Sequence, residues 1–375
     1  MRSRIFALGP LVVAIPLIVL GCGGCGKTVP TETGKSLPKI DLEPADLSGR
    51  GATFVTPIMD VWTHDFSEKT SKKVKLNYTG TGSGDGVSQM TKKLADFGCS
   101  DNPMTKKQME EVPAGETVIH VPTVVGAVVP AYNLPGINEP LKFTGPLLVE
   151  IFTGKIKKWN DGKIAAVNPG VTLPDLAIQP VFRADPSGTT FIFADYLAKV
   201  DANFAKSAGV SNLPKWPEGV GIKQPKSDGV AGHISKNPGT IGYIELTYAL
   251  DSKDQMKFGS VRNKAGKDVL ADFDSIAAAA EASIGLPQSQ EPYSLHELTY
   301  NLTDAPGEKS YPIAGMSFAV LYKKQSGAKG KALVEFLKWA TGPEGQDLAK
   351  ARNYAPLPPA LREKIAKRLE VVEIQ

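Results

Sequence analysis

Cysteine and histidine are scarce in this 375-residue sequence, which has only three cysteines and four histidines. So few of them argue against a disulfide scaffold or a multi-metal site, and we expect no metal and no cofactor. Charge of one sign is lacking too, because 43 Lys+Arg against 39 Asp+Glu leave a net charge of only +4. That excess is too small and too evenly spread for a protein whose main partner is nucleic acid. Any chemistry must come mostly from hydroxyls, carboxylates, arginine and backbone.

The remaining composition is that of a loop-rich globular protein. Hydrophobic residues make up 42% and charged residues 22%, with 37 Gly and 29 Pro. These proportions exclude a disordered, collagenous or coiled-coil chain, and the length is enough for about two or three domains of ~100–200 residues.

The N-terminus predicts export. Arg2 and Arg4 precede the apolar run 5–20, which is short for a membrane span and is interrupted by two prolines. The following Val-Leu-Gly-Cys resembles the lipobox of bacterial lipoproteins, in which Cys22 becomes the lipid-carrying first residue. We therefore expect a signal peptide over 1–21 and a lipidated flexible tether over 22–45, which is rich in proline.

Two motifs in this stretch are misleading. Residues 21–28 satisfy G-x-x-x-x-G-K-[ST], but a phosphate-cradling loop needs a strand before it and a helix after it. Here a hydrophobic signal precedes the motif, and Pro30 follows it. Cys22-x-x-Cys25 has no second pair to complete a zinc site, so lipidation explains Cys22 and leaves Cys25 without a role.

From about residue 47 onward, apolar runs alternate with amphipathic segments, which is typical of an α/β architecture. The predicted elements are a strand at 73–78, a helix carrying Val87, Met90 and Leu94, one or two buried strands over 118–132, a helix starting near Ser187 with Phe193, Tyr196, Leu197, Val200 and Phe204 on one face, and a helix carrying Leu333, Phe336 and Leu337 that ends at Gly342-Pro343. We find no internal repeat.

Two strand-to-helix corners have similar chemistry, Ser83-Gly84-Asp85 and Ser187-Gly188-Thr189. A helix start offers unpaired N–H groups and a positive dipole end, glycine lets a ligand approach, and a hydroxyl adds a donor. Both serines also suit ordinary N-caps, so that interpretation stays open. A dinucleotide loop does not fit the first corner, because Asp85 stands where G-x-G-x-x-G needs its third glycine.

The turn at 96–101 ends in Asp101. An isolated Asp is usually a cap or turn residue. At an anion site, however, an ionised carboxylate only accepts hydrogen bonds, so it repels a fully deprotonated oxyanion and accepts one that carries a proton. Asp101 would thereby distinguish phosphate from sulfate.

The chain resembles the phosphate-binding proteins of bacterial phosphate ABC importers (PstS) over nearly all of its length after the tether. The matching blocks, in order, are Gly51-Ala52-Thr53-Phe54, Gly80-Thr81-Gly82-Ser83-Gly84, Asp96-Phe97-Gly98-Cys99-Ser100-Asp101, Gly154-Lys155-Ile156-Lys157-Lys158-Trp159, Arg183-Ala184-Asp185-Pro186-Ser187-Gly188-Thr189, Gly239-Thr240-Ile241-Gly242-Tyr243 and Tyr311-Pro312-Ile313. The resemblance implies a two-lobed α/β periplasmic-binding fold of class II, with the ligand held between the lobes. We expect the first lobe to comprise 46–130 plus 315–375 and the second 131–314.

The resemblance also implies the site. The phosphate-binding residues would be Thr53, Phe54, Ser83, Asp101, Arg183, Ser187, Gly188 and Thr189. Asp185 would pair with Arg183 and moderate its charge. Two positions depart from the family: Asp85 stands where a small uncharged residue is usual, and we expect it to face solvent as a first-turn acid. Cys99 replaces a small residue, and we expect it to be a buried apolar side chain.

The resulting hypothesis is an exported, lipid-anchored phosphate receptor, a monomer and not an enzyme, that delivers phosphate to the membrane subunits of an ABC permease. A receptor for another oxyanion, such as sulfate or molybdate, is disfavoured by Asp101. A phosphoryl hydrolase with Ser187 or Thr189 as nucleophile gains little support, because the four histidines are scattered without ligand spacing. A surface module for sensing or adhesion, without coupling to transport, stays open.

Overall fold

Nine strands of the described chain form one sheet in the order β2-β1-β3-β12-β4-β8-β6-β7, with β9 paired to β4. The computed structural model describes residues 39–252, 255–283, 298 and 300–375. The sheet strands are β1 (Ala45–Gly51), β2 (Val74–Gly80), β3 (Phe97–Ser100), β4 (Val118–Tyr132), β6 (Gln179–Arg183), β7 (Ile222–Gln224), β8 (Thr240–Glu245), β9 (Lys257–Phe258) and β12 (Ala314–Tyr322). Shorter strands form two further sheets, namely β5 (Lys142–Phe143), β10 (Ser260–Arg262) and β11 (Asp268–Val269), and β13 (Lys324–Gln325) with β14 (Glu373–Ile374).

Helices alternate with these strands, which confirms the predicted α/β class. They are η1 (Thr53–Val55), α1 (Thr56–Lys69), α2 (Ser83–Thr91), α3 (Lys106–Glu110), α4 (Gly145–Phe152), α5 (Gly162–Val167), α6 (Gly188–Val200), α7 (Ala202–Ser207), α8 (Lys226–Lys236), α9 (Leu246–Asp251), α10 (Phe273–Ser283), α11 (Gly327–Thr341), α12 (Pro343–Ala351) and α13 (Pro359–Glu370).

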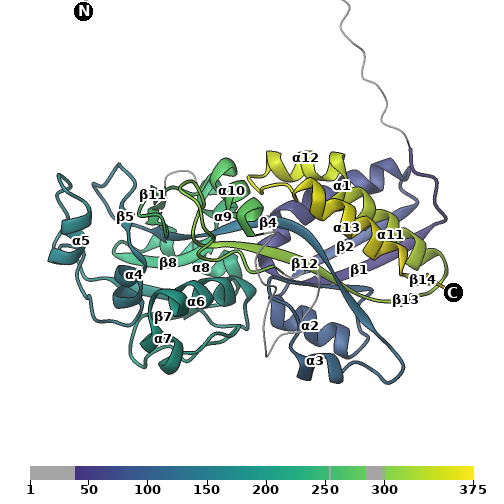
Figure 1. The fold of residues 1–375 in the computed structure, drawn as a ribbon, viewed down its shortest axis with the longest axis horizontal. Coiled ribbons are helices and arrows are strands. Elements are labelled where there is room, and N and C mark those ends of the chain that lie inside the picture. The colour runs from purple at the N-terminus through teal and green to yellow at the C-terminus, as the bar shows by residue number, and fades with distance from the viewer. Residues whose placement is uncertain (1–38, 253–254, 284–297, 299) are drawn as a thin grey trace, which may run out of the picture. The chain divides into compact units, whose positions relative to one another are not determined.

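The sheet joins two lobes through its two central strands. On one side β1 pairs in parallel with β2 and β3, and on the other β6 pairs in parallel with β7 and β8. Between them, β4 runs antiparallel to β12 along 118–127 and antiparallel to β8 along 128–132. Figure 1 shows β4 and β12 crossing from the half that carries α1 and α11 to the half that carries α4 and α6. The lobe boundaries at 130/131 and 314/315 stay a prediction.

Residues 118–132, for which the sequence predicted one or two buried strands, form the single strand β4. All fifteen of its residues are buried, as expected for a strand covered on both faces. Pro122 is accommodated where the register with β12 shifts, between the pairs Ser317–Val124 and Phe318–Pro122. A proline has no N–H for the ladder, so it is tolerated at such an irregularity.

The predicted helix after Ser187 is shorter than expected, and the placement of Phe204 on it was wrong. Helix α6 ends at Val200, and the next residue, Asp201, has an extended backbone. The Asp201 side chain accepts hydrogen bonds from the N–H groups of Asn203 and Phe204, at 2.7 and 3.1 Å, and so caps a separate helix α7. An internal cap ended the helix although the apolar spacing continued.

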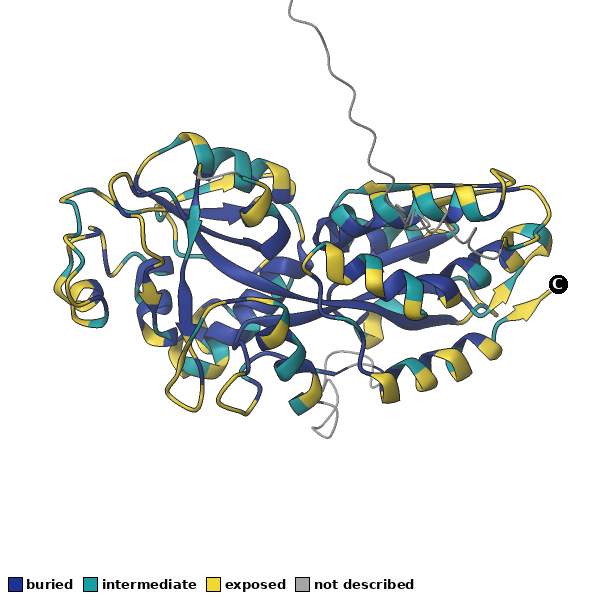
Figure 2. Cartoon of the chain, turned by 90° about the horizontal axis from the view of Figure 1, so that it is seen from above, coloured by how far each residue is buried: buried dark blue, intermediate teal, exposed yellow. Residues whose placement is uncertain are grey.

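The C-terminal segment returns to the first strands. Helix α11 contacts both β1 and β4, and α13 contacts α11 and β4, so the yellow helices of Figure 1 lie beside the purple strands. The other predicted helix end is confirmed, since α11 ends at Thr341 before Gly342, and Pro343 begins α12. Figure 2 shows the strands buried and the outer helix faces exposed.

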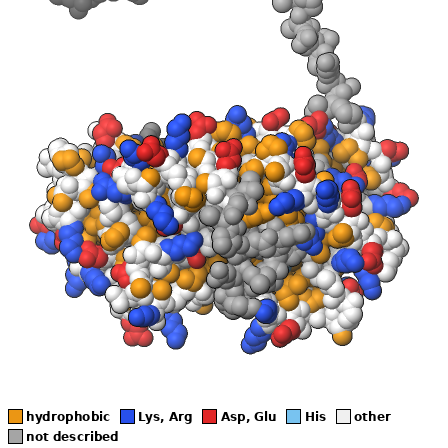
Figure 3. All heavy atoms as spheres, in the orientation of Figure 1, with side chains coloured by type: hydrophobic (Ala, Val, Ile, Leu, Met, Phe, Trp, Pro, Cys, Tyr) orange, Lys and Arg blue, Asp and Glu red, His pale blue; other side chains and the backbone are white. Residues whose placement is uncertain are grey.

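The predicted signal peptide, Cys22, Cys25 and most of the tether lie outside the described residues. Of the helices that the structure describes, none combines the length and the apolar character that crossing a membrane requires. On the face drawn in Figure 3, basic and acidic side chains are interspersed wherever described atoms form the surface.

Candidate functional site

The first predicted corner lies between β2 and α2. Gly82 is the N-cap of α2 with φ 102°, a conformation that favours glycine, and Ser83 is the first helical residue. The corner also needs glycine for contact with the other lobe: a Cβ on Gly82 would lie 2.5 Å from Asp185 Oδ2, and one on Gly84 would lie 2.5 Å from Pro186 Cβ. The glycines therefore allow two loops to meet backbone to backbone.

The second corner lies between β6 and α6. Ser187 is the N-cap of α6, and its Oγ accepts the Thr190 N–H at 3.2 Å. The N-cap interpretation is thus correct for Ser187, although its hydroxyl proton stays available for a ligand. Thr189 Oγ1 is buried and has no hydrogen-bond partner within the described chain. A buried hydroxyl without a partner is costly, so this position suits a ligand oxygen.

The two corners contact each other directly. The Gly84 N–H donates to Pro186 O at 3.1 Å, and the Gly188 N–H donates to Ser83 Oγ at 3.1 Å. A Cβ on Gly188 would overlap Ser83 Oγ and lie 2.5 Å from Asp101 Cβ. The starts of α2 and α6, 105 residues apart in sequence, thus converge on one point between the lobes.

Asp101 follows β3 and lies at this point. Its side chain is 4% exposed; Oδ1 accepts the Ser317 hydroxyl at 2.7 Å and Oδ2 accepts the Ser83 hydroxyl at 3.3 Å. Burial raises the pKa of Asp101 to about 7, and the hydrogen bonds from both serines and the charge of Arg183 limit the rise. The carboxyl therefore changes protonation near neutral pH.

Arg183 ends β6, and its side chain is 1% exposed. Its guanidinium donates two hydrogen bonds to Asp185, from Nε to Oδ1 at 3.0 Å and from Nη2 to Oδ2 at 2.5 Å. Burial opposes ionisation of Asp185, but the bonds and charge of Arg183, helped by the Lys226 N–H, hold its pKa below the ordinary value. The predicted pairing of Arg183 with Asp185 is present.

Thr53 and Phe54 lie in η1, after β1, and both are buried. Thr53 Oγ1 lies 2.7 Å from Ser227 Oγ, and Thr53 O accepts the Tyr248 hydroxyl at 2.7 Å. Phe54 O accepts the Tyr354 hydroxyl at 2.6 Å. The start of η1 is thus joined to α8 and α9 of the other lobe.

Sequence reasoning missed three residues of this cluster. Ser227 contacts both Thr53 and Arg183. Ser317 holds Asp101, and the Tyr243 hydroxyl accepts the Arg183 N–H at 3.2 Å. Tyr243 belongs to a block that matched the family, whereas no motif marks Ser227 or Ser317.

Asp85 and Cys99 are the two departures from the family pattern. Asp85 accepts hydrogen bonds from the Thr81 hydroxyl at 2.6 Å and from Gln89 at 3.1 Å, and its side chain is 35% exposed. It is a first-turn acid, as expected, but it is only partly exposed to solvent. Cys99 is a free and fully buried thiol. The expectation of a buried side chain is confirmed, and burial raises its pKa far above the ordinary value.

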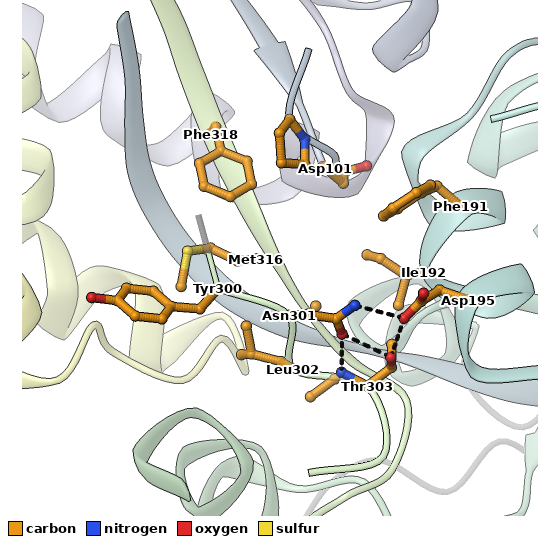
Figure 4. A pocket seen from close by; sticks show the side chains of 13 residues that line it. Asp101, Phe191, Ile192, Asp195, Tyr300, Asn301, Leu302, Thr303, Met316 and Phe318 are labelled. Atoms are coloured by element: carbon orange, nitrogen blue, oxygen red, sulfur yellow. Dashed lines mark hydrogen bonds between the residues drawn. The ribbon is translucent and has the colours of Figure 1, made fainter. Parts of the chain in front are cut away.

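A small cavity of about 30 Å³ borders Asp101 on one side. Figure 4 shows Phe318 and Met316 of β12 on one side of it and Phe191, Ile192 and Asp195 of α6 on the other. Its volume suits one or two water molecules and excludes an organic ligand.

The arrangement is suited to binding a small anion. Two helix starts, one guanidinium and several hydroxyls supply donors, and the Asp101 carboxyl lies among them as an acceptor. Within the described residues no three His, Cys, Asp or Glu side chains are grouped as metal ligands. His120 is buried, and its Nε2 accepts the Met104 N–H at 3.1 Å; His64 is exposed. His296 lies outside the described residues.

Comparison with known proteins finds relatives that are named phosphate-binding proteins. The PBP superfamily domain matches residues 33–344. The sequence is 39% identical over 322 residues to the phosphate-binding protein PstS of Xylella fastidiosa, and the aligned region covers 85% of this chain and 83% of the relative. It is 33% identical over 371 residues to the phosphate-binding protein PstS of Methanocaldococcus jannaschii, with 95% and 92% covered. The fold is similar to that of a phosphate binding protein from Stenotrophomonas maltophilia, with a TM-score of 0.66, 18% identity, and 86% of this chain and 94% of that chain covered.

Proposed function

Because the chain belongs to the PstS family of phosphate-binding proteins in the PBP superfamily, we propose that it binds inorganic phosphate between its lobes. The observation that carries the proposal is the buried Asp101 carboxyl, which lies among hydrogen-bond donors at two converging helix starts. A site built only of donors would accept any small anion. One carboxylate makes it selective for an anion that still has a proton to donate.

Each residue has a part in this proposal. The first lobe supplies the Thr53 hydroxyl, the Phe54 N–H and the Ser83 hydroxyl, and the second lobe supplies Arg183 and the start of α6. The phosphate-binding set is Thr53, Phe54, Ser83, Asp101, Arg183, Ser187, Gly188 and Thr189. The buried, unpartnered Thr189 hydroxyl supports it, because a phosphate oxygen would satisfy that group.

Binding would replace contacts between the lobes with contacts to phosphate. The Gly188 N–H, which donates to Ser83 Oγ at 3.1 Å, would donate to a phosphate oxygen instead. The exchange keeps the number of hydrogen bonds while making them charge-assisted, which roughly doubles their strength. Phosphate thereby stabilises the approach of the two lobes.

Discrimination between phosphate and sulfate depends on the protonation state of Asp101. When ionised, Asp101 accepts the O–H of monohydrogen phosphate and repels sulfate, which has no proton to donate at neutral pH. Asp185, paired with Arg183 at 2.5 Å, offsets part of the guanidinium charge. The site then binds by directed hydrogen bonds more than by net charge, which favours selectivity over general anion affinity.

The transport role extends this proposal. The chain would be exported, lose residues 1–21, carry a lipid on Cys22 and remain attached to the outer face of the membrane as a monomer. It would hand phosphate to the membrane subunits of an ABC permease without chemical turnover. A receptor for sensing or adhesion shares the same site, and phosphate uptake by cells that lack the protein distinguishes it: normal uptake would favour sensing.

Equilibrium binding of labelled phosphate to the full-length protein tests the proposed function. We expect saturable binding of one phosphate per chain and no hydrolysis of phosphate esters. An Arg183→Ala variant should lose most of the affinity, and Lys155→Ala, a surface change in the same lobe, should lose none. Absence of saturable binding by the wild-type protein would refute the proposal.

A further inference from the structure

One buried hydroxyl that is not in the proposed phosphate-binding set lies between the lobes. Ser227, the second residue of α8, is 1% exposed. Its Oγ lies 2.7 Å from Thr53 Oγ1 and accepts a hydrogen bond from Arg183 Nη1 at 3.4 Å. Ser227 thus joins one proposed phosphate-binding residue from each lobe.

Helix α8 does not require this hydroxyl for its own stability. Its N-cap is Pro225, which makes no side-chain hydrogen bond to the helix. The first helical N–H, from Lys226, donates to Asp185 Oδ1 at 2.8 Å. Lys226 has φ 57°, a conformation that costs a non-glycine residue free energy and that persists where the surroundings impose it. The strained turn brings Ser227 to Arg183 and Thr53.

Proton counting gives the Ser227 hydroxyl a definite task. Arg183 can only donate, so Ser227 Oγ is the acceptor of that bond. The bond between Ser227 and Thr53 uses one of their two hydroxyl protons, which leaves one proton for a ligand. Because the guanidinium polarises Ser227, Ser227 becomes the better donor to Thr53, and the remaining proton is on Thr53 Oγ1.

We propose that Ser227 is a positioning residue of the phosphate site, which turns the Thr53 hydroxyl and the Arg183 guanidinium toward the anion. The inference rests on the proposed function. The Thr53 backbone is held separately, because its carbonyl accepts the Tyr248 hydroxyl at 2.7 Å. Loss of the Ser227 hydroxyl should therefore disorient one donor and one guanidinium nitrogen without releasing the loop.

Ser227 sets affinity and not selectivity. The donor that it orients is an ordinary hydroxyl, which serves any tetrahedral oxyanion equally. Phosphate and sulfate should therefore weaken by the same factor when Ser227 is changed. This separates Ser227 from Asp101, whose change should alter the ratio between the two anions.

The test measures phosphate and sulfate affinity of the full-length protein with Ser227→Ala, Thr53→Val and both together. We expect Ser227→Ala to bind phosphate about tenfold more weakly, with an unchanged phosphate-to-sulfate ratio. The double variant should bind phosphate at most about threefold more weakly than Thr53→Val alone, because both changes remove parts of one hydrogen-bonded chain. Ser227→Cys keeps the volume with a poor donor and should weaken binding as the alanine does.

Ser310→Ala is the matched control, since Ser310 is also 1% exposed and its hydroxyl donates to Pro306 O. It should leave phosphate affinity unchanged. The inference would be overturned if Ser227→Ala or Ser227→Cys bound phosphate within twofold of wild type. Additive losses in the double variant, or an equal loss in Ser310→Ala, would also overturn it. None of these results would overturn the proposed function. A wild-type protein that binds no phosphate would overturn the proposed function together with this inference.

Discussion

Asp101→Asn should reduce the difference in stability of the ligand-free protein between pH 5 and pH 8 by about 3 kcal/mol. Burial raises the pKa of Asp101 from its ordinary 3.8 to about 7, against hydrogen bonds from Ser317 and Ser83. Since the folded protein holds this proton more tightly than the unfolded chain, the carboxyl favours folding most at low pH. That contribution is lost as the pH rises through about 7.

The expected magnitude follows from the size of the shift. Each pKa unit corresponds to about 1.4 kcal/mol, so full ionisation of Asp101 opposes folding by roughly 4 kcal/mol. Part of that cost is already present at pH 5, where the unfolded carboxyl is ionised. The change between pH 5 and pH 8 is therefore about 3 kcal/mol. Asparagine does not titrate, and it keeps the size and an oxygen acceptor.

Urea unfolding in phosphate-free buffer measures this difference. The free energy of unfolding of each protein is determined at pH 5, 6, 7 and 8. The other titrating groups, including the buried Glu245, are present in both proteins, so most of the difference between the two curves comes from Asp101, with a smaller part from its charge acting on Glu245. The variant should gain about 3 kcal/mol over wild type from pH 5 to pH 8. Parallel curves would refute the assignment of a buried carboxyl that titrates near neutrality.

The remaining predictions concern binding. Gly188→Ala should weaken phosphate binding by roughly 10–100-fold with little change in melting temperature, because its Cβ would overlap Ser83 Oγ and force the lobes apart; binding calorimetry would contradict this if affinity were unchanged. Arg183→Lys should lose roughly 10–100-fold, because an ammonium group cannot replace the two-bond grip on Asp185; equal affinity would show that charge alone matters. Sulfate should compete better in wild type as the pH falls below about 7, where Asp101 gains a proton; competition independent of pH would argue against discrimination by the protonation state of Asp101.

Local signals in the sequence were enough to find both corners. Glycine-rich turns between a strand and a helix, at Ser83 and Ser187, predicted helix starts that the structure has at α2 and α6. The apolar run 118–132 predicted buried strand structure, and β4 is one strand over the whole run. Each of these features depends on residues close together in the chain.

Contacts between segments far apart in the sequence carried no such signal. Ser227 lies in the first turn of α8, which no sequence motif marks, and it reaches Thr53, 174 residues away in sequence, only because the lobes meet. Ser317 lies in a buried strand, where a hydroxyl opposite Asp101 has no local pattern. The helix boundary before Phe204 was missed for a different reason, because apolar spacing continued across the Asp201 cap. Tertiary contacts decided the positions of Ser227 and Ser317, whereas a local cap decided the helix boundary.

The most direct test of the central claim is the ratio of phosphate to sulfate affinity in wild type and Asp101→Asn at pH 8, where Asp101 is mostly ionised. The wild-type protein should bind phosphate and reject sulfate, and the variant should bind sulfate markedly better relative to phosphate. A variant that keeps the wild-type ratio, or a wild-type protein that binds both anions equally, would contradict the role of Asp101 as the group that checks for a proton.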